Sequence, residues 1–257
     1  MADILNNMIP VKRAGRQTVL FSNPPAIISS ATVVGPMEGK GPLGPYFDMV
    51  LKDDTWGEDS WEKAERKMFE HTVRRAMDKV NLQSGGVDCL LGGDLLNQII
   101  SANFAARELK LPFLGLYGAC STMAESLLIG SMLIDGGYAG RVACIATSHF
   151  STAERQYRNP LEMGGQTTPT AQRTVTGAGC SIAANPTLEG DRLYGNVFVT
   201  AGTIGKVTDL GITDVNNMGA AMAPAAVDTL TAHLSDTGRG VMDYDLIVTG
   251  DLGRFGS

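Results

Sequence analysis

The alternation of apolar and polar positions along the chain predicts a protein that mixes helices with strands. The clearest helix is expected over residues 58–80, where Asp59 and Glu62 have capping-box spacing and apolar residues recur every three or four positions. A second helix is predicted over residues 95–110, with Asp94 as its N-cap. Short apolar runs bounded by glycine, proline or polar residues predict strands over 18–22, 26–34, 87–92, 113–117, 141–147 and 174–184.

Residues 111–137 hold the most informative change of pattern. The run at 113–117 has the length of a strand that is covered on both faces, and helical spacing begins after Cys120 and ends at Gly136-Gly137. Because both sides of this helix carry apolar or small residues, we expect it to be buried nearly all round. Cys120 is therefore predicted in the first turn of a buried helix.

A cysteine at a helix start lies near unpaired backbone N–H groups and the positive end of the helix dipole, which favours the thiolate. Three interpretations of Cys120 stay open. It serves as a nucleophile, it marks a place where backbone donors hold a ligand carboxylate, or it is a small buried filler between Ala119 and Ser121.

His149 follows directly on the predicted strand 141–147. Ligands of open α/β sheets gather outside the carboxyl ends of the strands, so His149, Arg155 and Arg158 are the charged candidates for a site. The alternative is that both arginines are ordinary surface charges. The glycine-rich loops 35–45 and 159–173 are either surface excursions or functional segments, and the second has the composition of a lid or a subunit contact.

Composition narrows the class of protein. A chain of 257 residues with 44% hydrophobic residues is long enough for one α/β domain or two intimate halves, and no apolar run reaches the roughly 18 residues of a membrane span. The formal net charge of −6 argues against nucleic-acid binding. The 4 cysteines are too scattered for a disulfide framework or a metal site, which favours a reducing compartment.

An internal duplication predicts the architecture. Residues 87–95 align with 244–252 in a strand that ends in Gly-Asp, and residues 30–35 resemble 200–205. The helix of the second copy is expected near residues 222–234. We therefore predict a first half over 1–190 that carries Cys120 and a second over 191–257, packed as one compact unit. The second copy lacks counterparts of 111–184, so the chain is expected to be a truncated form.

A duplicated half with a cysteine at the start of a buried helix resembles the thiolase superfamily, through Tyr-Gly-Ala-Cys-Ser at 117–121 and Thr-Gly-Ala-Gly at 176–179. This resemblance implies a duplicated α/β/α/β/α layered fold with an incomplete second half. Further motifs are similar to the stage V sporulation protein AD family of spore-forming bacteria. They are Gly-Asp-Leu-Leu-Asn-Gln at 93–98, Thr-Ala-Glu-Arg-Gln at 152–156, Asp-Leu-Gly-Ile-Thr-Asp at 209–214 and Met-Ala-Pro-Ala-Ala at 222–226.

The family resemblance implies a thiolase-like protein without catalysis, which binds dipicolinic acid (pyridine-2,6-dicarboxylate) and helps its uptake into the forespore. It further implies a homodimer, with 113–117 near the two-fold axis, on the cytoplasmic side of the inner forespore membrane with other stage V sporulation A proteins. The ligand is expected as the free acid or its calcium chelate, with no metal site or cofactor. The residues expected to hold it are Cys120, Ser121, His149, Arg155 and Arg158.

Two other functions stay open. The first is an acyl-CoA condensing enzyme or acyltransferase with Cys120 as nucleophile and a CoA thioester as substrate. In that superfamily a histidine and an asparagine or second histidine assist the cysteine, and these are expected beyond Ser257, so this function lacks its base and its charge stabiliser here. The second is an interaction scaffold whose cavity is vestigial.

Overall fold

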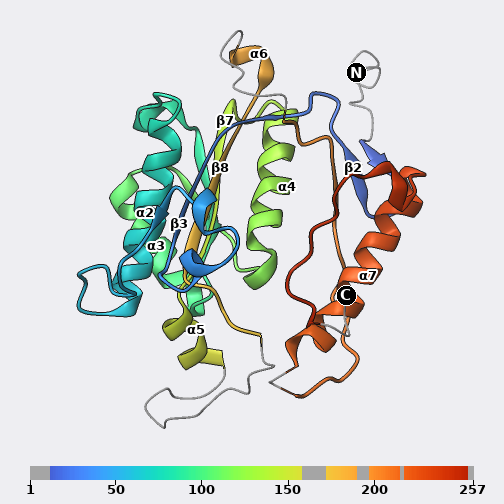
Figure 1. Cartoon of the computed structure of the whole chain (residues 1–257). Coiled ribbons are helices and arrows are strands. Elements are labelled where there is room, and N and C mark those ends of the chain that lie inside the picture. The colour runs from blue at the N-terminus through green and yellow to red at the C-terminus, as the bar shows by residue number, and fades with distance from the viewer. Residues whose placement is uncertain (1–11, 158–171, 190–196, 215–216, 254–257) are drawn as a thin grey trace.

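The protein stacks helices and sheets in five layers, as a computed structural model shows (Figure 1). Helices α2 (Trp61–Asp78) and α3 (Ile100–Leu109) cover one face of a six-stranded sheet, and α4 (Thr122–Asp135) covers the other. A three-stranded sheet follows, and α7 (Met218–Thr237) packs against it. The structure describes residues 12–157, 172–189, 197–214 and 217–253.

The six-stranded sheet contains most of the predicted strands. Its order is β4 (Met49–Val50), β3 (Ala26–Val34), β8 (Gly177–Ala184), β7 (Arg141–Ser148), β5 (Cys89–Gly93) and β6 (Phe113–Gly115). Strands β5, β6 and β7 run parallel, whereas β8 is antiparallel to both of its neighbours, β3 and β7. The parallel strands therefore end at the same edge as β3.

Apolar side chains fill both faces of this sheet. Phe69 and Leu90 belong to the cluster under α2 and α3, and Leu91 belongs to the cluster under α4. Each large side chain buried in this way contributes roughly 1.5–3 kcal/mol. Gly130 lets α4 approach closely, since a Cβ there would lie 3.0 Å from the sulfur of Cys144.

Two predicted N-caps differ in the structure. Helix α2 begins at Trp61 behind Ser60, whose hydroxyl accepts the amide of Lys63 at 3.3 Å, while Asp59 pairs with the Lys63 ammonium at 2.7 Å. Asp94 is not the residue directly before α3, and it caps the first turn of that helix from eight positions before Ala102. Its carboxylate accepts the amides of Leu96 (2.8 Å) and Ala102 (2.6 Å), spanning the short 3₁₀ turn η4 (Asn97–Ile99) before α3.

The segment around Cys120 is less covered than its sequence predicts. Strand β6 is an edge strand, and Leu114 is 52% exposed, because β5 is its one neighbour among the described strands. Five residues of α4 are buried, but Ala124 is exposed and most of the apolar ones are half-buried. The prediction of a helix buried nearly all round is wrong, because the small sheet covers only part of its outer side.

The small sheet joins the two ends of the chain. It has the order β1 (Arg13–Ala14), β2 (Thr18–Leu20) and β9 (Ala201–Thr203), all antiparallel. Lys12 pairs with Asp135 at 2.7 Å. Residues 12–15 are therefore held in place by this ion pair and by the small sheet.

The second Gly-Asp segment is not a strand. Residues 244–248 belong to no sheet of the described chain, and Leu246 and Val248 are exposed. In the first copy, β5 lies between β6 and β7, which satisfy its backbone groups on both sides. No described strand lies in either position here, so the predicted strand is wrong although the preceding helix, α7, is present.

Candidate functional site

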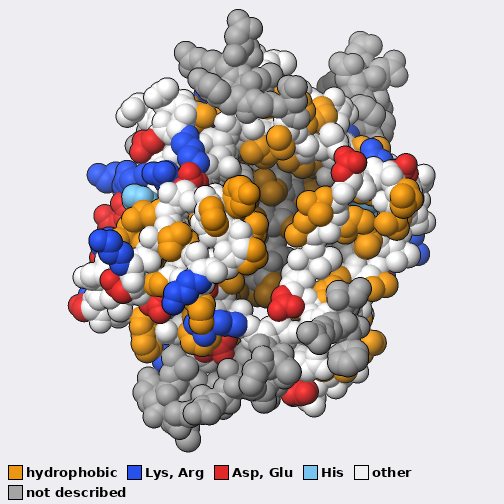
Figure 2. Space-filling view, viewed as in Figure 1, with side chains coloured by type: hydrophobic (Ala, Val, Ile, Leu, Met, Phe, Trp, Pro, Cys, Tyr) orange, Lys and Arg blue, Asp and Glu red, His pale blue; other side chains and the backbone are white. Residues whose placement is uncertain are grey.

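A cavity of about 540 Å³ opens at the edge where β3 and β7 end and β8 begins. The turn that carries Cys120 forms one part of its wall, residues 172–176 form another, and the start of α7 with Gly250 and Asp251 completes it. The surface is hollowed between the six-stranded sheet and the α7 region, with hydrophobic side chains on both sides (Figure 2). Both predicted halves thus contribute to the cavity, whose volume suits a small-molecule ligand.

Cys120 lies in a strained turn at the cavity. It belongs to the 3₁₀ turn η5 (Ala119–Ser121), which leads directly into α4, and Ala119 has a φ of 49°, a left-handed conformation that costs a non-glycine residue about 1 kcal/mol or more. Cys120 is exposed, whereas Cys144 and Cys180 are buried and Cys89 is half-buried. The interpretation of Cys120 as a buried filler therefore does not hold.

The backbone donors beside Cys120 are partly used. The amide of Ser121 bonds the carbonyl of Gly118 at 3.1 Å, and the amide of Thr122 bonds the carbonyl of Ala119. The Ser121 hydroxyl donates to the same Gly118 carbonyl at 2.8 Å. Ser121 is therefore a support of the turn and is not among the residues that line the cavity. Fewer backbone N–H donors are therefore free to bind an anion beside Cys120 than the sequence predicts.

His149 lies outside the cavity, and its ring is fully engaged. One ring nitrogen, Nε2, lies 2.7 Å from the carbonyl oxygen of Asp54, and the other accepts the amide of Ser151 at 3.1 Å. A carbonyl can only accept, so Nε2 carries the hydrogen of a neutral ring. Burial lowers the pKa of His149 and keeps it neutral. His149 is thus the N-cap of α5 (Phe150–Tyr157) and an anchor for residues 53–56.

The predicted arginines are not brought to the cavity either. Arg155 forms an ion pair with Glu62 and lies 5.7 Å above the ring of Trp61, on the side of α5 that faces α2. Arg158 lies outside the described residues. Of the five residues that the sequence suggests for the site, only Cys120 lines the cavity.

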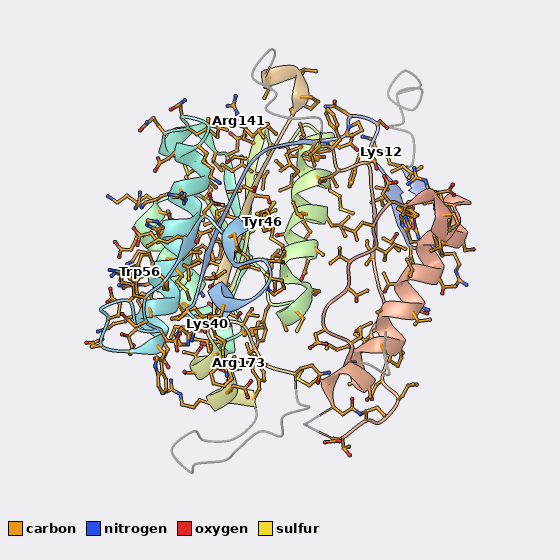
Figure 3. All side chains as sticks on the ribbon, in the orientation of Figure 1. Lys12, Lys40, Tyr46, Trp56, Arg141 and Arg173 are labelled. Carbon is orange, nitrogen blue, oxygen red and sulfur yellow. The ribbon has the colours of Figure 1, made fainter. Side chains whose placement is uncertain are left out.

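The cavity has charged groups that sequence reasoning missed. Arg173 lines it from the segment before β8 (Figure 3). Its guanidinium carbon lies 3.7 Å from the ring centre of Phe150. Glu38 lines it from the loop after β3 and accepts the amide of Thr176 at 3.1 Å, while Asp251 lies near the second Gly-Asp turn. Their loops are conspicuous in the sequence, but nothing in it selects these side chains.

Two acidic side chains outside the cavity lining, Glu65 and Asp94, are fully buried. Glu65 of α2 accepts the hydroxyl of Thr152 in α5 at 2.9 Å, and its other carboxylate oxygen has no hydrogen-bond partner in the described chain. Burial and the neighbouring Asp94 raise the pKa of Glu65 to about 8. Burial also raises the pKa of Asp94. Glu65 is therefore held mainly as the neutral acid at pH 7.

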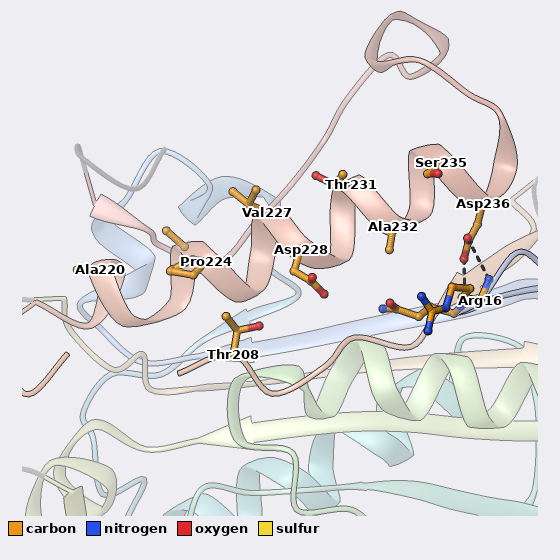
Figure 4. A pocket seen from close by; sticks show the side chains of 12 residues that line it. Arg16, Thr208, Ala220, Pro224, Val227, Asp228, Thr231, Ala232, Ser235 and Asp236 are labelled. Carbon is orange, nitrogen blue, oxygen red and sulfur yellow. Dashed lines mark hydrogen bonds between the residues drawn. The ribbon is translucent and has the colours of Figure 1, made fainter. Parts of the chain in front are cut away.

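A second, open cavity of about 950 Å³ runs along α7 (Figure 4). Small side chains such as Ala220, Ala223 and Ala232 line it, together with Arg16. Asp236 at its end accepts the amides of residues 16–18 at 2.9–3.0 Å. These bonds tie the β1–β2 turn to α7 and give this groove a structural role.

In the part of the chain that the structure describes, no cluster of three or more histidine, cysteine, aspartate or glutamate side chains has the arrangement of a metal site. Among the described helices, not one combines the length and the apolar character that a membrane crossing requires.

Comparison with known proteins gives a family and a fold. The model of the family described as stage V sporulation protein AD matches residues 15–257. Stage V sporulation protein AD of Bacillus subtilis (strain 168) is 47% identical over 247 residues, which are 96% of this chain and 71% of that protein.

Solved structures of OleA from Xanthomonas campestris, a thiolase-fold protein, share the architecture. One variant has a TM-score of 0.63 at 15% identity over 92% of this chain and 80% of its own. A cerulenin-bound variant has a TM-score of 0.64 at 15% identity over 97% of this chain and 80% of its own. At this identity the likeness shows the fold alone, and it confirms the predicted thiolase-like layers.

Proposed function

The chain belongs to the stage V sporulation protein AD family, and on this premise we propose that it binds dipicolinic acid in the cavity beside Cys120, without catalysis, and helps its uptake into the forespore. The observation that carries the proposal is the composition of this cavity. Among the described residues, its lining combines apolar side chains with one arginine. Such a wall suits the binding of a small aromatic anion.

The apolar part of the wall suits the faces of a pyridine ring. Phe47 and Leu95 lie in loops beside the six-stranded sheet, and Met218 and Met222 come from α7. Methionine side chains adapt readily to a flat ring and make favourable sulfur–aromatic contacts. The hydroxyl of Thr176, which accepts the amide of Phe150 and keeps its own hydrogen to donate, and the backbone of the Cys120 turn supply polar partners for the carboxylates.

The charge of the cavity bears on the form of the ligand. Glu38 and Asp251 are both acidic, so a free dianion must lie away from them. A calcium chelate of dipicolinate carries less negative charge and tolerates both carboxylates. We therefore propose that calcium strengthens the binding, and titration with and without calcium at fixed ionic strength compares the two forms.

The partners are proposed from the family and from the exposed edge of the sheet. Strand β6 leaves Leu114 exposed with one strand neighbour in the described chain, and such an edge suits pairing with a second copy in a homodimer. We propose that this dimer sits at the inner forespore membrane, on the cytoplasmic side, with other stage V sporulation A proteins. Sedimentation of the chain at several concentrations tests the dimer.

Calorimetric titration with dipicolinate tests the function. We expect saturable binding with about one ligand per chain, weakened by Met222→Asp, which adds a negative charge to the apolar wall of the cavity. A matched control is Met242→Asp, because Met242 is exposed and lies outside the cavity. If the folded protein gives no saturable heat with or without calcium, dipicolinate is not its ligand.

The strained turn at Cys120 favours one alternative, acyl transfer through a thioester on its sulfur. Its exposure and its place in the cavity are those of a nucleophile. Incubation with an acyl-CoA would then transfer the acyl group to Cys120 and release free CoA, giving a mass increase that Cys120→Ala abolishes. The carrier function predicts that no such adduct forms.

A further inference from the structure

Arg173 has the position and the free hydrogen-bond donors of a residue that binds a carboxylate. It is the one cationic side chain among the described residues that line the 540 Å³ cavity. It forms no ion pair with another described residue, whereas Arg155, eighteen positions earlier, is paired with Glu62. With no ion-pair partner among the described residues, this cation retains its hydrogen-bond donors for a ligand.

The guanidinium of Arg173 is oriented by an aromatic ring. Its central carbon lies 3.7 Å from the ring centre of Phe150, which corresponds to close stacking. Stacking occupies the flat face of the guanidinium and leaves its edge, which carries the N–H donors, free for a carboxylate. A carboxylate can then accept two parallel hydrogen bonds from that edge.

The backbone segment that follows Arg173 is held by hydrogen bonds to β7 and α5. Thr174 donates to the carboxylate of Glu154 at 3.1 Å, and Ser148 donates to the carbonyl of Val175 at 2.7 Å. Phe150 is fixed as well, because its amide donates to the hydroxyl of Thr176 at 3.0 Å. The ring and the arginine are thus connected through one hydrogen-bonded segment, so that little ordering remains to be done on binding.

Charge restricts where an anion can bind in this cavity. Glu38 is anchored to the amide of Thr176, and Asp251 is the other carboxylate in the wall. Both repel a carboxylate, so its favourable position is at Arg173. A ligand with a second carboxylate can place that group toward the backbone at Cys120.

We propose that Arg173, stacked on Phe150, is the residue that selects carboxylate ligands for this cavity, with Phe150 as its positioning residue. This inference rests on the proposed function, because dipicolinate is its probe. It replaces the arginines that the sequence suggests, and it assigns the site a planar anion with at least one free carboxylate.

Calorimetry with dipicolinate and with picolinate, which has one carboxylate, tests the inference on the 257-residue chain. We expect Arg173→Gln to weaken dipicolinate binding by about 30-fold or more, and Arg173→Lys by about 10-fold because lysine lacks the planar fork. Phe150→Leu keeps the charge but loses the stack, and we expect a loss of about 3–10-fold. A variant that loses the contact to the second carboxylate of dipicolinate should also bind dipicolinate with a smaller advantage over picolinate.

The control is Arg155→Gln. It removes an arginine that stacks on Trp61 and pairs with Glu62 in α5, the helix that carries Phe150, without touching the cavity. It should leave affinity within about threefold of the unmodified chain. Thermal melting verifies that each variant is folded. Equal affinity of Arg173→Gln and the unmodified chain overturns the role of Arg173 and leaves the proposed function intact, whereas no binding by the unmodified chain overturns both.

Discussion

The six-stranded sheet and the α7 region carry related sequence, yet they differ in how their segments are satisfied. In the sheet, Leu91 of β5 is fully buried between neighbouring strands and α4. In the α7 region, the aligned residue Val248 is 78% exposed in an irregular segment. The comparison teaches that a strand motif becomes a strand only where neighbours satisfy its backbone and cover its side chains.

The largest effect is expected when a core side chain is truncated in the six-stranded sheet and the aligned side chain is truncated in the α7 region. Leu91→Ala should lower the free energy of unfolding by about 3 kcal/mol, because it leaves a void in a packed cluster. Val248→Ala should change it by less than about 0.5 kcal/mol. Chemical denaturation of both variants measures the difference, and equal effects would mean that residues 244–248 are packed in solution.

The two Gly-Asp aspartates sharpen the comparison. Asp94 is buried and accepts the amides of Leu96 and Ala102, so Asp94→Ala should cost about 2 kcal/mol. Asp251 is exposed and accepts the amide of Gly253 at 2.9 Å, and its replacement by alanine should cost less than about 0.5 kcal/mol. The same denaturation experiment applies. A larger loss for Asp251 would contradict the assignment of the two environments.

Glu65 adds a pH dependence to the six-stranded region. Its pKa is raised from 4.5 to about 8, so the folded state retains a proton that the unfolded chain releases above pH 4.5. The stabilising contribution is full below pH 4.5 and is lost as pH rises toward 8. Glu65→Gln keeps an oxygen for the Thr152 hydroxyl and removes the titration.

We therefore expect Glu65→Gln to be about as stable as the unmodified chain at pH 5 and about 1–3 kcal/mol more stable at pH 8. Thermal and urea unfolding at both pH values measure this. Glu70→Gln is a matched control, because Glu70 lies on the exposed side of the same helix with Arg74. A constant difference between Glu65→Gln and the unmodified chain would show that Glu65 does not titrate in this range.

The smallest effect is expected in the α7 region. Asp236→Asn should leave global unfolding nearly unchanged and speed hydrogen exchange at residues 16–18, whose amides its carboxylate accepts. The pKa of Asp236 is lowered by these amides, so their protection, measured relative to intrinsic exchange at each pH, should fall in the unmodified chain once the pH is low enough to protonate the carboxylate. If neither the Asp236→Asn substitution nor the lower pH changes the protection of these amides, Asp236 does not hold the β1–β2 turn to α7.

The sequence predicts the six-stranded region well because the strands there have clear apolar patterns. Strands β3 and β7 and helix α2 follow apolar patterns that depend on their own residues, and they form close to the predicted bounds. Residues 244–248 have the same pattern but do not form a strand, because strand pairing depends on other segments. The layered fold was predictable chiefly through the resemblance of short motifs to a known superfamily.

The candidate site was predictable only at Cys120, whose position follows from a strand that meets a helix. His149 follows a strand as predicted, but sequence does not show toward which side of the strand end its ring turns, and the ring caps α5. Arg173 gains its role from a stack on Phe150. That contact joins residues 23 positions apart, and it exists only once β7 and β8 have paired.

Alkylation of Cys120 followed by mass spectrometry tests the central claim most directly, because Cys120 is the exposed cysteine of the chain. A maleimide should label it at least tenfold faster than Cys144 or Cys180, and saturating dipicolinate should slow that labelling at least about tenfold by filling the cavity. Labelling of Cys120 at an unchanged rate under saturating dipicolinate would contradict the claim that this cavity is where the ligand binds.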